Sequence, residues 1–523
     1  MGHPAHHRRA DDPLPLAADR HDAPARGDAL KILVVGAGVA GLTAAADLAR
    51  RGADVTILER AASHGGKMRH VMVDGRGIDG GPTVFTMRWI FEGLFADAGE
   101  SLSDHLGVYS TNVLARHAWR AGGRLDLFAD IEASVQAIGD FAGAADARGY
   151  REFCARAAAI YRTLEGSFIG AEKPSQLDLV RRVGLSRLGE LWRTAPFRSM
   201  WSALGDHFSD PRLRQLFGRY ATYVGASPWF APATLMLVAH VEQDGVWLVQ
   251  GGMRAVADAL RGLAERQGVR LRCGADVTRI IIEGGRAKGV ELANGERLMA
   301  DAVLFNGDAA ALPSLGAPGP KPAQRSLSAI TWCVNAPTSG FDLAHHNVFF
   351  AEDYAEEFRA IFNRREVTAA PTIYICAQDR GLQPPPPGTP ERLLLLINAP
   401  ADGDSRDFNA SDYIERTHSL LASCGLHIGE GSAVATTPSG FNALFPTTGG
   451  ALYGMASHGA TATLRRSGAR GKIPGLYLAG GSVHPGPGVP MAAMSGRLAA
   501  ARLLEDAAGR STSVGFAPGR HSR

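Results

Sequence analysis

The stretch KILVVGAGVAGLTAAADLARRGADVTILER, residues 31–60, predicts a strand, a tight turn, a helix and a second strand. Residues 31–35 are apolar and residues 42–50 are rich in alanine, and Gly36, Gly38 and Gly41 stand between them. In such a unit the first glycine permits the turn, the second lets the backbone approach a pyrophosphate, and the third allows close packing of helix on strand. The helix N-terminus favours phosphate, so we expect a dinucleotide site rather than a purely structural turn.

Two features further along the chain indicate which nucleotide binds. The second strand, residues 55–58, ends at Glu59, at the spacing from the third glycine where an acid accepts hydrogen bonds from ribose hydroxyls. Gly65, Gly66 and Lys67 follow in SHGGKMR, where a glycine pair exposes backbone and the ammonium can serve phosphates or a flavin. Read alone, this second segment could equally be a surface turn with a solvated lysine.

The order of glycines, acid and glycine–basic pair resembles the N-terminal signature of the FAD-binding amine oxidase and carotenoid desaturase superfamily. This resemblance implies FAD as the cofactor. It also implies an α/β fold, in which a Rossmann-like FAD-binding domain of the amine oxidase and carotenoid desaturase type carries a substrate-binding sheet and a helical insertion.

Composition sets the broad class. The 523 residues are 45% hydrophobic and 20% charged, as in ordinary globular proteins, and the net charge of +3 gives no reason to expect a nucleic-acid partner. The five cysteines are scattered and form neither a CxxC pair nor a metal quartet, so we expect no metal and a reducing cytoplasm. No stretch of 18 uninterrupted apolar residues is present, so we expect no membrane-spanning helix.

The pattern of elements along the chain predicts a discontinuous arrangement of domains. We expect a disordered leader over residues 1–29, whose histidines have no specific role, and a flexible tail over 506–523. The FAD-binding domain is expected to combine residues 30–84, 246–312 and 441–505, with a hairpin turn at Asn294 and Gly295. Residues 85–245 are expected to form a largely helical region that faces substrate and membrane, and 313–440 a substrate-binding sheet.

An apolar cluster between residues 85 and 95 has three possible interpretations. It contains Phe85, Trp89 and Phe91 among other large apolar side chains. A core helix is the plainest interpretation, and the alternatives are the wall of an apolar pocket or a patch that enters a membrane interface. If the protein attaches peripherally to a membrane, this cluster is our predicted contact.

The C-terminal stretch GLYLAGGSVHPGPGVPMAAMSGRLAAARLLE, residues 475–505, predicts a second helix N-terminus aimed at the cofactor. A strand over 476–478 leads to Gly480 and Gly481, then to a Gly/Pro-rich loop and a helix from Met491. If the flavin pyrimidine lies there, the helix dipole stabilises the negative charge that arrives with a hydride. The alternative, a simple connector, does not account for the small residues of the helix.

This stretch closely resembles the signature of the bacterial-type phytoene dehydrogenases, except at Val483 and Pro487, which put the fine geometry of the loop in doubt. The segments HHNVFFAEDYAEEFRAIF and PTIYICAQDRG resemble the hydroxycarotenoid 3,4-desaturases of that family, which introduce the C3–C4 double bond into acyclic 1-hydroxycarotenoids on the route to spheroidene or spirilloxanthin. The two resemblances together imply these cofactor contacts, among which Val277 would offer its backbone to the adenine: Gly36, Ala37, Gly38, Ala40, Gly41, Glu59, Arg60, Gly65, Gly66, Lys67, Gly81, Pro82, Thr83, Val277, Asn306, Gly480, Gly481, Gly488, Val489 and Met491.

Desaturation requires a hydride acceptor, a destination for a proton, and an apolar channel. His484 could take the proton or bind a substrate hydroxyl, although a loop histidine held by backbone hydrogen bonds is the alternative. His240, Glu242 and Asp244 form a second candidate group. Because one dinucleotide motif is visible, NAD(P) is not expected as a partner, and the resemblance implies quinone or oxygen as acceptor and a substrate dissolved in the membrane.

Four other functions remain open on the sequence. They are a phytoene desaturase, an amine or protoporphyrinogen oxidase, a flavin-dependent carotenoid isomerase, and a carotenoid carrier with a structural flavin. Amine oxidases usually carry an acid where this chain has Gly481. An isomerase would conserve the mass of its product, and a carrier would bind pigment without turnover.

Overall fold

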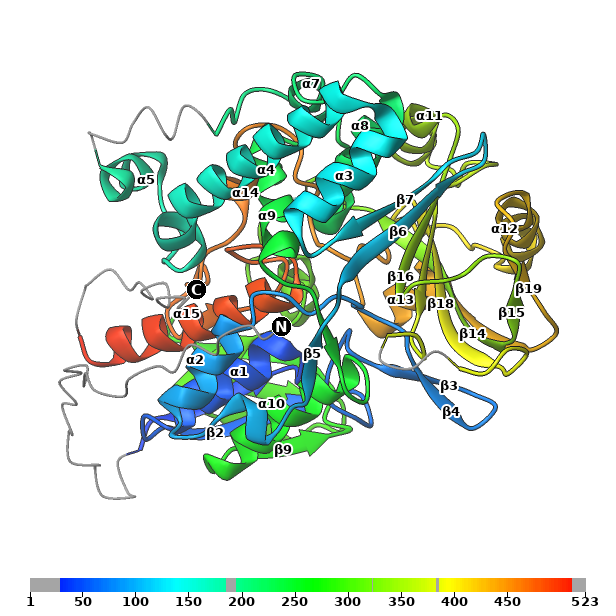
Figure 1. Ribbon diagram of the computed structural model, residues 1–523. Helices are drawn as coiled ribbons and strands as arrows, with labels where there is room; N and C mark the ends of the chain where they lie inside the picture. Colours follow the sequence, from blue (N-terminus) through cyan, green and yellow to red (C-terminus); the bar gives the residue numbers. More distant parts are fainter. Residues whose placement is uncertain (1–28, 185–193, 322, 382–384, 510–523) are drawn as a thin grey trace, which may run out of the picture.

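The computed structural model describes residues 29–184, 194–321, 323–381 and 385–509 (Figure 1). A unit built on a parallel sheet lies at the lower left of Figure 1, a second unit built on a larger sheet lies at the right, and helices cover the top. The expected leader and tail fall outside the described residues except at residue 29 and at 506–509, where the last helix continues to Ala507.

The first unit contains a five-stranded parallel sheet. In spatial order its strands are β21 (Leu476–Leu478), β13 (Ala302–Phe305), β1 (Lys31–Val35), β2 (Asp54–Glu59) and β9 (Arg270–Cys273). The apolar segment that opens the first motif lies in the middle, between β13 and β2, and four of its five residues are buried. Because the strands are parallel, the segments that follow β1, β2, β13 and β21 meet at one edge of the sheet.

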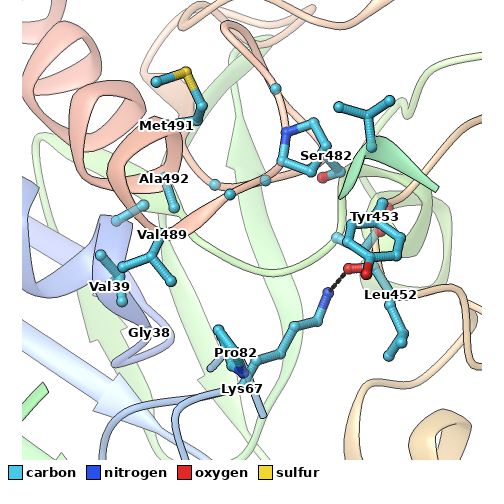
Figure 2. A pocket seen from close by; sticks show the side chains of 18 of the residues that line it. Gly38, Val39, Lys67, Pro82, Leu452, Tyr453, Ser482, Val489, Met491 and Ala492 are labelled. Atoms are coloured by element: carbon cyan, nitrogen blue, oxygen red, sulfur yellow. Dashed lines mark hydrogen bonds between the residues drawn. The ribbon is translucent and has the colours of Figure 1, made fainter. Parts of the chain in front are cut away.

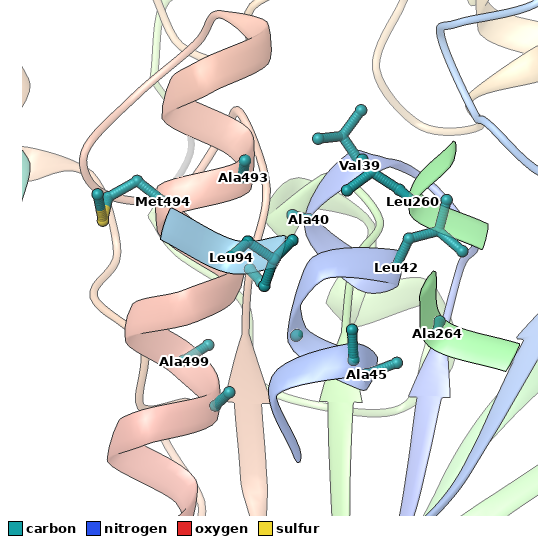
Figure 3. Close-up of a cluster of buried hydrophobic side chains, with 14 of the residues drawn as sticks. Val39, Ala40, Leu42, Ala45, Leu94, Leu260, Ala264, Ala493, Met494 and Ala499 are labelled. Atoms are coloured by element: carbon teal, nitrogen blue, oxygen red, sulfur yellow. The ribbon is translucent and has the colours of Figure 1, made fainter. Parts of the chain in front are cut away.

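Helices pack against this sheet in a closely spaced layer. They are α1 (Val39–Ala49), α2 (Trp89–Asp97), α10 (Arg254–Arg266) and α15 (Val489–Ala507). Figure 3 shows α1 between α15 and α10, with Leu94 of α2 beside them. The helix α1 begins three residues before the predicted start, so Gly41 lies in its first turn, where an added Cβ would come within 2.1 Å of the Gly36 carbonyl oxygen.

The second unit is built on a seven-stranded sheet. In spatial order its strands are β20 (Ser432–Thr436), β14 (Ser328–Ala336), β18 (Glu391–Ala399), β17 (Ile373–Ala377), β16 (His346–Phe350), β6 (Val113–Trp119) and β7 (Arg124–Phe128). All neighbours are antiparallel except β16 and β6. The sheet therefore takes two strands from residues 85–245, a region expected to be largely helical.

Helices and short strands complete the two units. The helical region contains α3 (Ile131–Ala142), α4 (Ala144–Leu164), α5 (Gln176–Val183), α7 (Met200–Leu204), α8 (Pro211–Gly218) and α9 (Leu237–Asp244). Later in the chain lie the helices α11 (Tyr354–Arg359), α12 (Ser411–Ser423), α13 (Pro438–Leu444) and α14 (Ala462–Arg465). A three-stranded sheet is formed by β10 (Val277–Glu283), β11 (Arg286–Leu292) and β12 (Arg297–Met299). Two-stranded sheets pair β3 (His70–Val73) with β4 (Arg76–Asp79), β5 (Val108–Ser110) with β8 (Trp247–Val249), and β15 (Thr338–Ser339) with β19 (His427–Ile428). The predicted turn at Asn294 and Gly295 joins β11 to β12.

The apolar cluster at residues 85–95 is a core helix, and its prediction as a membrane patch is wrong. Phe85 and Phe91 are fully buried, with ring centroids 5.0 Å apart, and Trp89 is half-buried. They join the core formed by α1, α10 and α15. Since these large side chains face inward, they are not available for contact with a bilayer. Among the helices described, none combines the length and apolar character needed to cross a membrane.

Candidate active site

A cavity of about 1400 Å³ extends from the edge of the parallel sheet to the face of the seven-stranded sheet. Of the predicted cofactor contacts, Ala37 and Gly41 do not line it. The others do: Gly36, Gly38, Ala40, Glu59, Arg60, Gly65, Gly66, Lys67, Gly81, Pro82, Thr83, Val277, Asn306, Gly480, Gly481, Gly488, Val489 and Met491. The fold thus brings residues from three distant parts of the chain to one wall.

Glu59 lies where the cavity meets the carboxyl end of β2. Its Oε2 accepts a hydrogen bond from the Ala37 N–H at 2.7 Å, and its Oε1 accepts one from the Ala61 N–H at 2.9 Å. A carboxylate has about four lone-pair sites, so acceptors remain for the hydroxyls of a ribose. Ala37 supports the turn from behind, because its carbonyl also accepts a bond from the Gly65 N–H.

Asn306 ties the first helix to two strands. Its Oδ1 accepts a hydrogen bond from the Gly41 N–H at 2.9 Å, and its Nδ2 donates to the Ala479 carbonyl at 3.1 Å. The amide therefore holds the ends of β13 and β21 against the start of α1. This bond also explains why Gly41 does not reach the cavity.

The start of α15 lies beside the start of α1 in this wall. Figure 2 shows Val489 beside Val39 of α1, with Ala492 and Met491 further along α15. Ser495, one turn further along α15, accepts a hydrogen bond from the Gly480 N–H at 3.1 Å, which fixes the glycine loop to the helix. The positive end of the helix dipole borders the cavity and favours negative charge there.

Lys67 projects into the cavity from the other side (Figure 2). Its Nζ donates to the Leu452 carbonyl at 2.5 Å and lies 5.4 Å from the centroid of the Phe445 ring. The surrounding protein removes water from the ammonium and lowers the pKa of Lys67, while Asp308 opposes this shift. The side chain thus places its amine at the wall of the cavity.

The residues present fit FAD. An added Cβ at Gly81 would lie 1.8 Å from the Lys67 carbonyl oxygen, and one at Gly66 would lie 3.2 Å from the Gly38 Cα, so the wall depends on bare backbone. Glu59 offers acceptors for a ribose, and two helix N-termini border the space. The volume exceeds the roughly 300–1000 Å³ of usual small-ligand pockets, which leaves room for a second molecule.

His484 does not line the cavity. Its Nε2 lies 3.0 Å from the Phe168 carbonyl oxygen and 2.9 Å from that of Ala171, and burial lowers its pKa to about 4. The neutral ring therefore donates from Nε2 to the segment 168–171, of which Phe168 and Ile169 face the cavity. This geometry favours the alternative of a loop histidine held by backbone bonds, and a direct catalytic role stays a prediction.

Of the second candidate group, Glu242 reaches the cavity. It is buried and accepts a hydrogen bond from the Tyr223 hydroxyl, which also lies 3.4 Å from Nη2 of Arg219. The His240 ring instead packs against Tyr161 in a tilted arrangement, with ring centroids 4.9 Å apart. Sequence reasoning missed Arg219 and Tyr223, and the segment GRYATY gives no signal beyond a helical pattern.

Arg466 is a further residue that the sequence did not indicate. It is 1% exposed, and its guanidinium donates to the carbonyls of Tyr453, Met455 and Gly481 at 2.9–3.2 Å. Burial lowers its pKa to about 10, which still leaves it charged at neutral pH. The side chain braces the glycine loop against the segment that faces Lys67.

Comparison with known proteins agrees with this geometry. The family model of the flavin containing amine oxidoreductases matches residues 39–504. A hydroxyneurosporene desaturase of Rubrivivax gelatinosus is 53% identical over 94% of this chain and 97% of its own length. The protein of that name from Cereibacter sphaeroides is 44% identical over 92% of this chain and 99% of its own length. A zeta-carotene-forming phytoene desaturase of Myxococcus xanthus is 30% identical over 91% of this chain and 94% of its own length.

Solved structures support the fold alone. A putrescine oxidase variant matches with a TM-score of 0.59 at 16% identity, over 91% of this chain and 99% of that one. An oxidoreductase from Methanosarcina mazei matches with a TM-score of 0.58 at 15% identity, over 91% and 100%. The solved structures confirm the expected fold, and the family model of flavin containing enzymes confirms the expected cofactor. The chain belongs to the flavin-containing amine oxidoreductase family, within its carotenoid desaturases, and is an FAD-dependent oxidoreductase.

Proposed function

We propose that this protein desaturates an acyclic carotenoid, and that its substrate is a 1-hydroxycarotenoid of the hydroxyneurosporene type oxidised at the C3–C4 bond. The observation that carries the proposal is the cavity, which joins the expected FAD wall to an apolar space large enough for a second molecule. Full-length relatives named hydroxyneurosporene desaturase, 42–53% identical, favour the hydroxylated substrate over phytoene.

The substrate part of the cavity is lined by aliphatic side chains. They come from the helical region and from the seven-stranded sheet: Leu164, Ile169, Leu235, Leu237, Val238, Val241, Val348, Leu394 and Leu396. Such walls fit a polyene and exclude water, which prevents loss of reactive intermediates and strengthens electrostatic interactions at the reacting atoms.

The chain's own residues support the chemistry around the reacting bond. FAD, when bound, supplies the hydride acceptor for the oxidation. The dipole of α15 and the Lys67 ammonium favour negative charge at the cofactor wall. A proton must also leave the substrate, and Glu242 is our candidate for the group that accepts it. Among His240, Glu242 and Asp244, Glu242 is the residue that lines the cavity.

We also propose that the protein takes its substrate from a membrane surface. Phe197 lines the cavity with 74% of its surface exposed, and Phe230 nearby is 54% exposed. The helix α5 adds Leu179 to the cavity and carries the exposed Arg181 in its last turn, whose charge suits anionic lipid headgroups. A lipid-dissolved quinone or oxygen would then accept the electrons.

The proposed function is tested by product analysis. We would incubate the FAD-loaded protein and membranes separately with 1-hydroxyneurosporene and with phytoene, and measure the products by chromatography and mass. Loss of two hydrogens from the hydroxylated substrate alone is expected. Conversion of phytoene instead would assign the chain to the phytoene desaturases.

A further inference from the structure

A chain of three hydrogen-bonding side chains interrupts the apolar wall of the cavity. Thr83 Oγ1 lies 2.7 Å from the Tyr374 hydroxyl, which lies 2.7 Å from Nδ1 of His346. Thr83 and Tyr374 line the cavity, whereas His346 is buried behind them. Their neighbours on this wall include Val348, Leu394 and Leu396, none of which requires a polar partner.

The strand register places these groups on one face. Strands β16 and β17 are antiparallel, with Val348 opposite Tyr374 and His346 opposite Cys376. Since side chains alternate along a strand, Tyr374 and His346 share the face on which Val348 meets the cavity. Burying such polar groups in an apolar wall is unfavourable for folding alone, which suggests that they serve a ligand.

The charge state of the group suits an uncharged ligand. Burial raises the pKa of Tyr374 well above its usual value, and burial, with the nearby His345 and Arg219, lowers the pKa of His346 well below its own. Both are therefore neutral at physiological pH. The Thr83 hydroxyl has one donor and two acceptor sites, and Tyr374 occupies one of these, so Thr83 can still bond a ligand hydroxyl in the cavity.

We propose that Thr83 and Tyr374, held in place by His346, form a binding site for the tertiary alcohol of a hydroxylated polyene, and so select that substrate and position its reacting bond. This inference rests on the proposed function for the identity of the polyene. His346 is a positioning residue, because it acts through the Tyr374 hydroxyl. The ligand chemistry is a neutral alcohol at the end of an apolar chain.

The position of the site agrees with the expected bond. In a 1-hydroxycarotenoid three covalent bonds of about 1.5 Å separate the oxygen from C3, so the hydroxyl must bind within a few ångströms of the atoms that react. Thr83 is itself a predicted cofactor contact, together with Gly81 and Pro82, and all three line the cavity wall. The site therefore lies beside the expected cofactor rather than at the far end of the channel.

A charged cluster offers the competing position. Arg219, Tyr223 and Glu242 also line the cavity, and Tyr223 connects the other two by hydrogen bonds. Arg219 and Glu242 already bind the Tyr223 hydroxyl, so a neutral alcohol would have to displace one of these hydrogen bonds to bind there. His346 and Tyr374, in contrast, belong to the two sequence segments that resemble the hydroxycarotenoid 3,4-desaturases.

The experiment compares two substrates that differ in one hydroxyl. We would measure kcat/KM of the FAD-loaded protein for 1-hydroxyneurosporene and for neurosporene, and the affinity for both by quenching of tryptophan fluorescence. The variants are Thr83→Val, Thr83→Ser and Tyr374→Phe. Binding is measured whether or not turnover occurs, so the site is tested even if the proposed reaction fails.

We expect Thr83→Val and Tyr374→Phe to lower the preference for the hydroxylated polyene over neurosporene about tenfold or more, measured as the ratio of the two kcat/KM values and of the two affinities. Thr83→Ser restores the preference because it keeps the hydroxyl. Tyr150→Phe and Thr163→Val are matched controls. Each removes a buried hydroxyl that does not line the cavity: that of Tyr150 donates to Gln243, and that of Thr163 donates to the Ala159 carbonyl.

Two results would overturn the proposal. One is a preference for the hydroxylated polyene that stays within about threefold of wild type in both Thr83→Val and Tyr374→Phe, with FAD content and melting temperature intact. The other is a preference lost in Tyr223→Phe but kept in Tyr374→Phe, which would move the hydroxyl to the charged cluster. A wild-type protein that binds the alcohol selectively but forms no desaturated product would refute the proposed function and leave this site standing.

Discussion

The side chain of Glu242 decides how the substrate loses its proton in this account. It faces the cavity and is hydrogen-bonded by Tyr223. Replacing it by glutamine removes the proton acceptor but keeps the shape, so we expect kcat to fall about a hundredfold with unchanged FAD content. Asp244→Asn is the control, because this acid of the same helix α9 does not line the cavity. Full turnover of Glu242→Gln would exclude Glu242 as the group that accepts the substrate proton.

His484 links stability to pH. Its pKa is about 4 in the folded protein against a usual value of 6.5, so between those values the unfolded chain binds a proton that the folded chain does not. Stability is therefore lost as pH falls from about 6.5 to about 4, by about 3 kcal/mol. His484→Gln keeps an N–H donor for the carbonyls and does not titrate.

Urea unfolding at about pH 7 and about pH 4.5 measures this effect. We expect the free energy of unfolding of His484→Gln to gain on that of wild type as the pH falls, with other histidines cancelling in the difference. The same variant, loaded with FAD, should keep its turnover. If the free energies of unfolding of the two proteins had the same pH dependence, the burial account would be contradicted. Loss of turnover in His484→Gln would support a catalytic role for His484.

Local sequence identifies some of the site residues and not others. Gly36, Gly38 and Glu59 form a contiguous pattern whose spacing carries its own physical reason, so they could be predicted. The bond between Thr83 and Tyr374 joins residues 291 positions apart, and no periodicity or motif encodes such a pairing. For the same reason the brace formed by Arg466 could not be predicted: its partners are backbone carbonyls that only the fold brings together.

At the scale of elements, the contact between α1 and α15 depends on Gly496. A Cβ added there would lie 2.3 Å from the Ala40 carbonyl oxygen, so Gly496→Ala must push the helices apart. We expect a loss of about 1–3 kcal/mol in the free energy of unfolding and weaker FAD retention. Gly139→Ala, in α3, is the control, since its Cβ would lie 3.6 Å from the nearest atom and should stabilise the helix. Equal effects of the two substitutions would contradict this packing argument.

The sequence predicted elements well where one pattern dominates. The strand β21 has the predicted bounds, and β1, α1 and β2 follow the glycine motif to within three residues. The contribution of β6 and β7 to the larger sheet was missed, because short strands inside a helical region gain their pairing from the distant β16. The apolar face at residues 85–95 was ambiguous, since burial and membrane contact require the same side chains.

At the scale of the whole molecule, the cavity mouth near Phe197 is the expected membrane contact. Phe197→Glu and Phe230→Glu together should reduce cosedimentation with anionic lipid vesicles several-fold, because they replace exposed apolar surface with negative charge. Met299→Glu is the control, since Met299 is 52% exposed on β12 of the small sheet β10–β11–β12 and does not line the cavity. Unchanged cosedimentation of the double variant would place the membrane contact elsewhere.

The central claim is that this protein removes two hydrogens from a hydroxylated polyene and transfers the electrons to FAD. The most direct test mixes the FAD-loaded protein with 1-hydroxyneurosporene in the absence of oxygen and follows the flavin absorption together with the mass of the product. The account predicts bleaching of the flavin in proportion to a product lighter by two hydrogens. A product of unchanged mass, or a lighter product formed without bleaching, would contradict it.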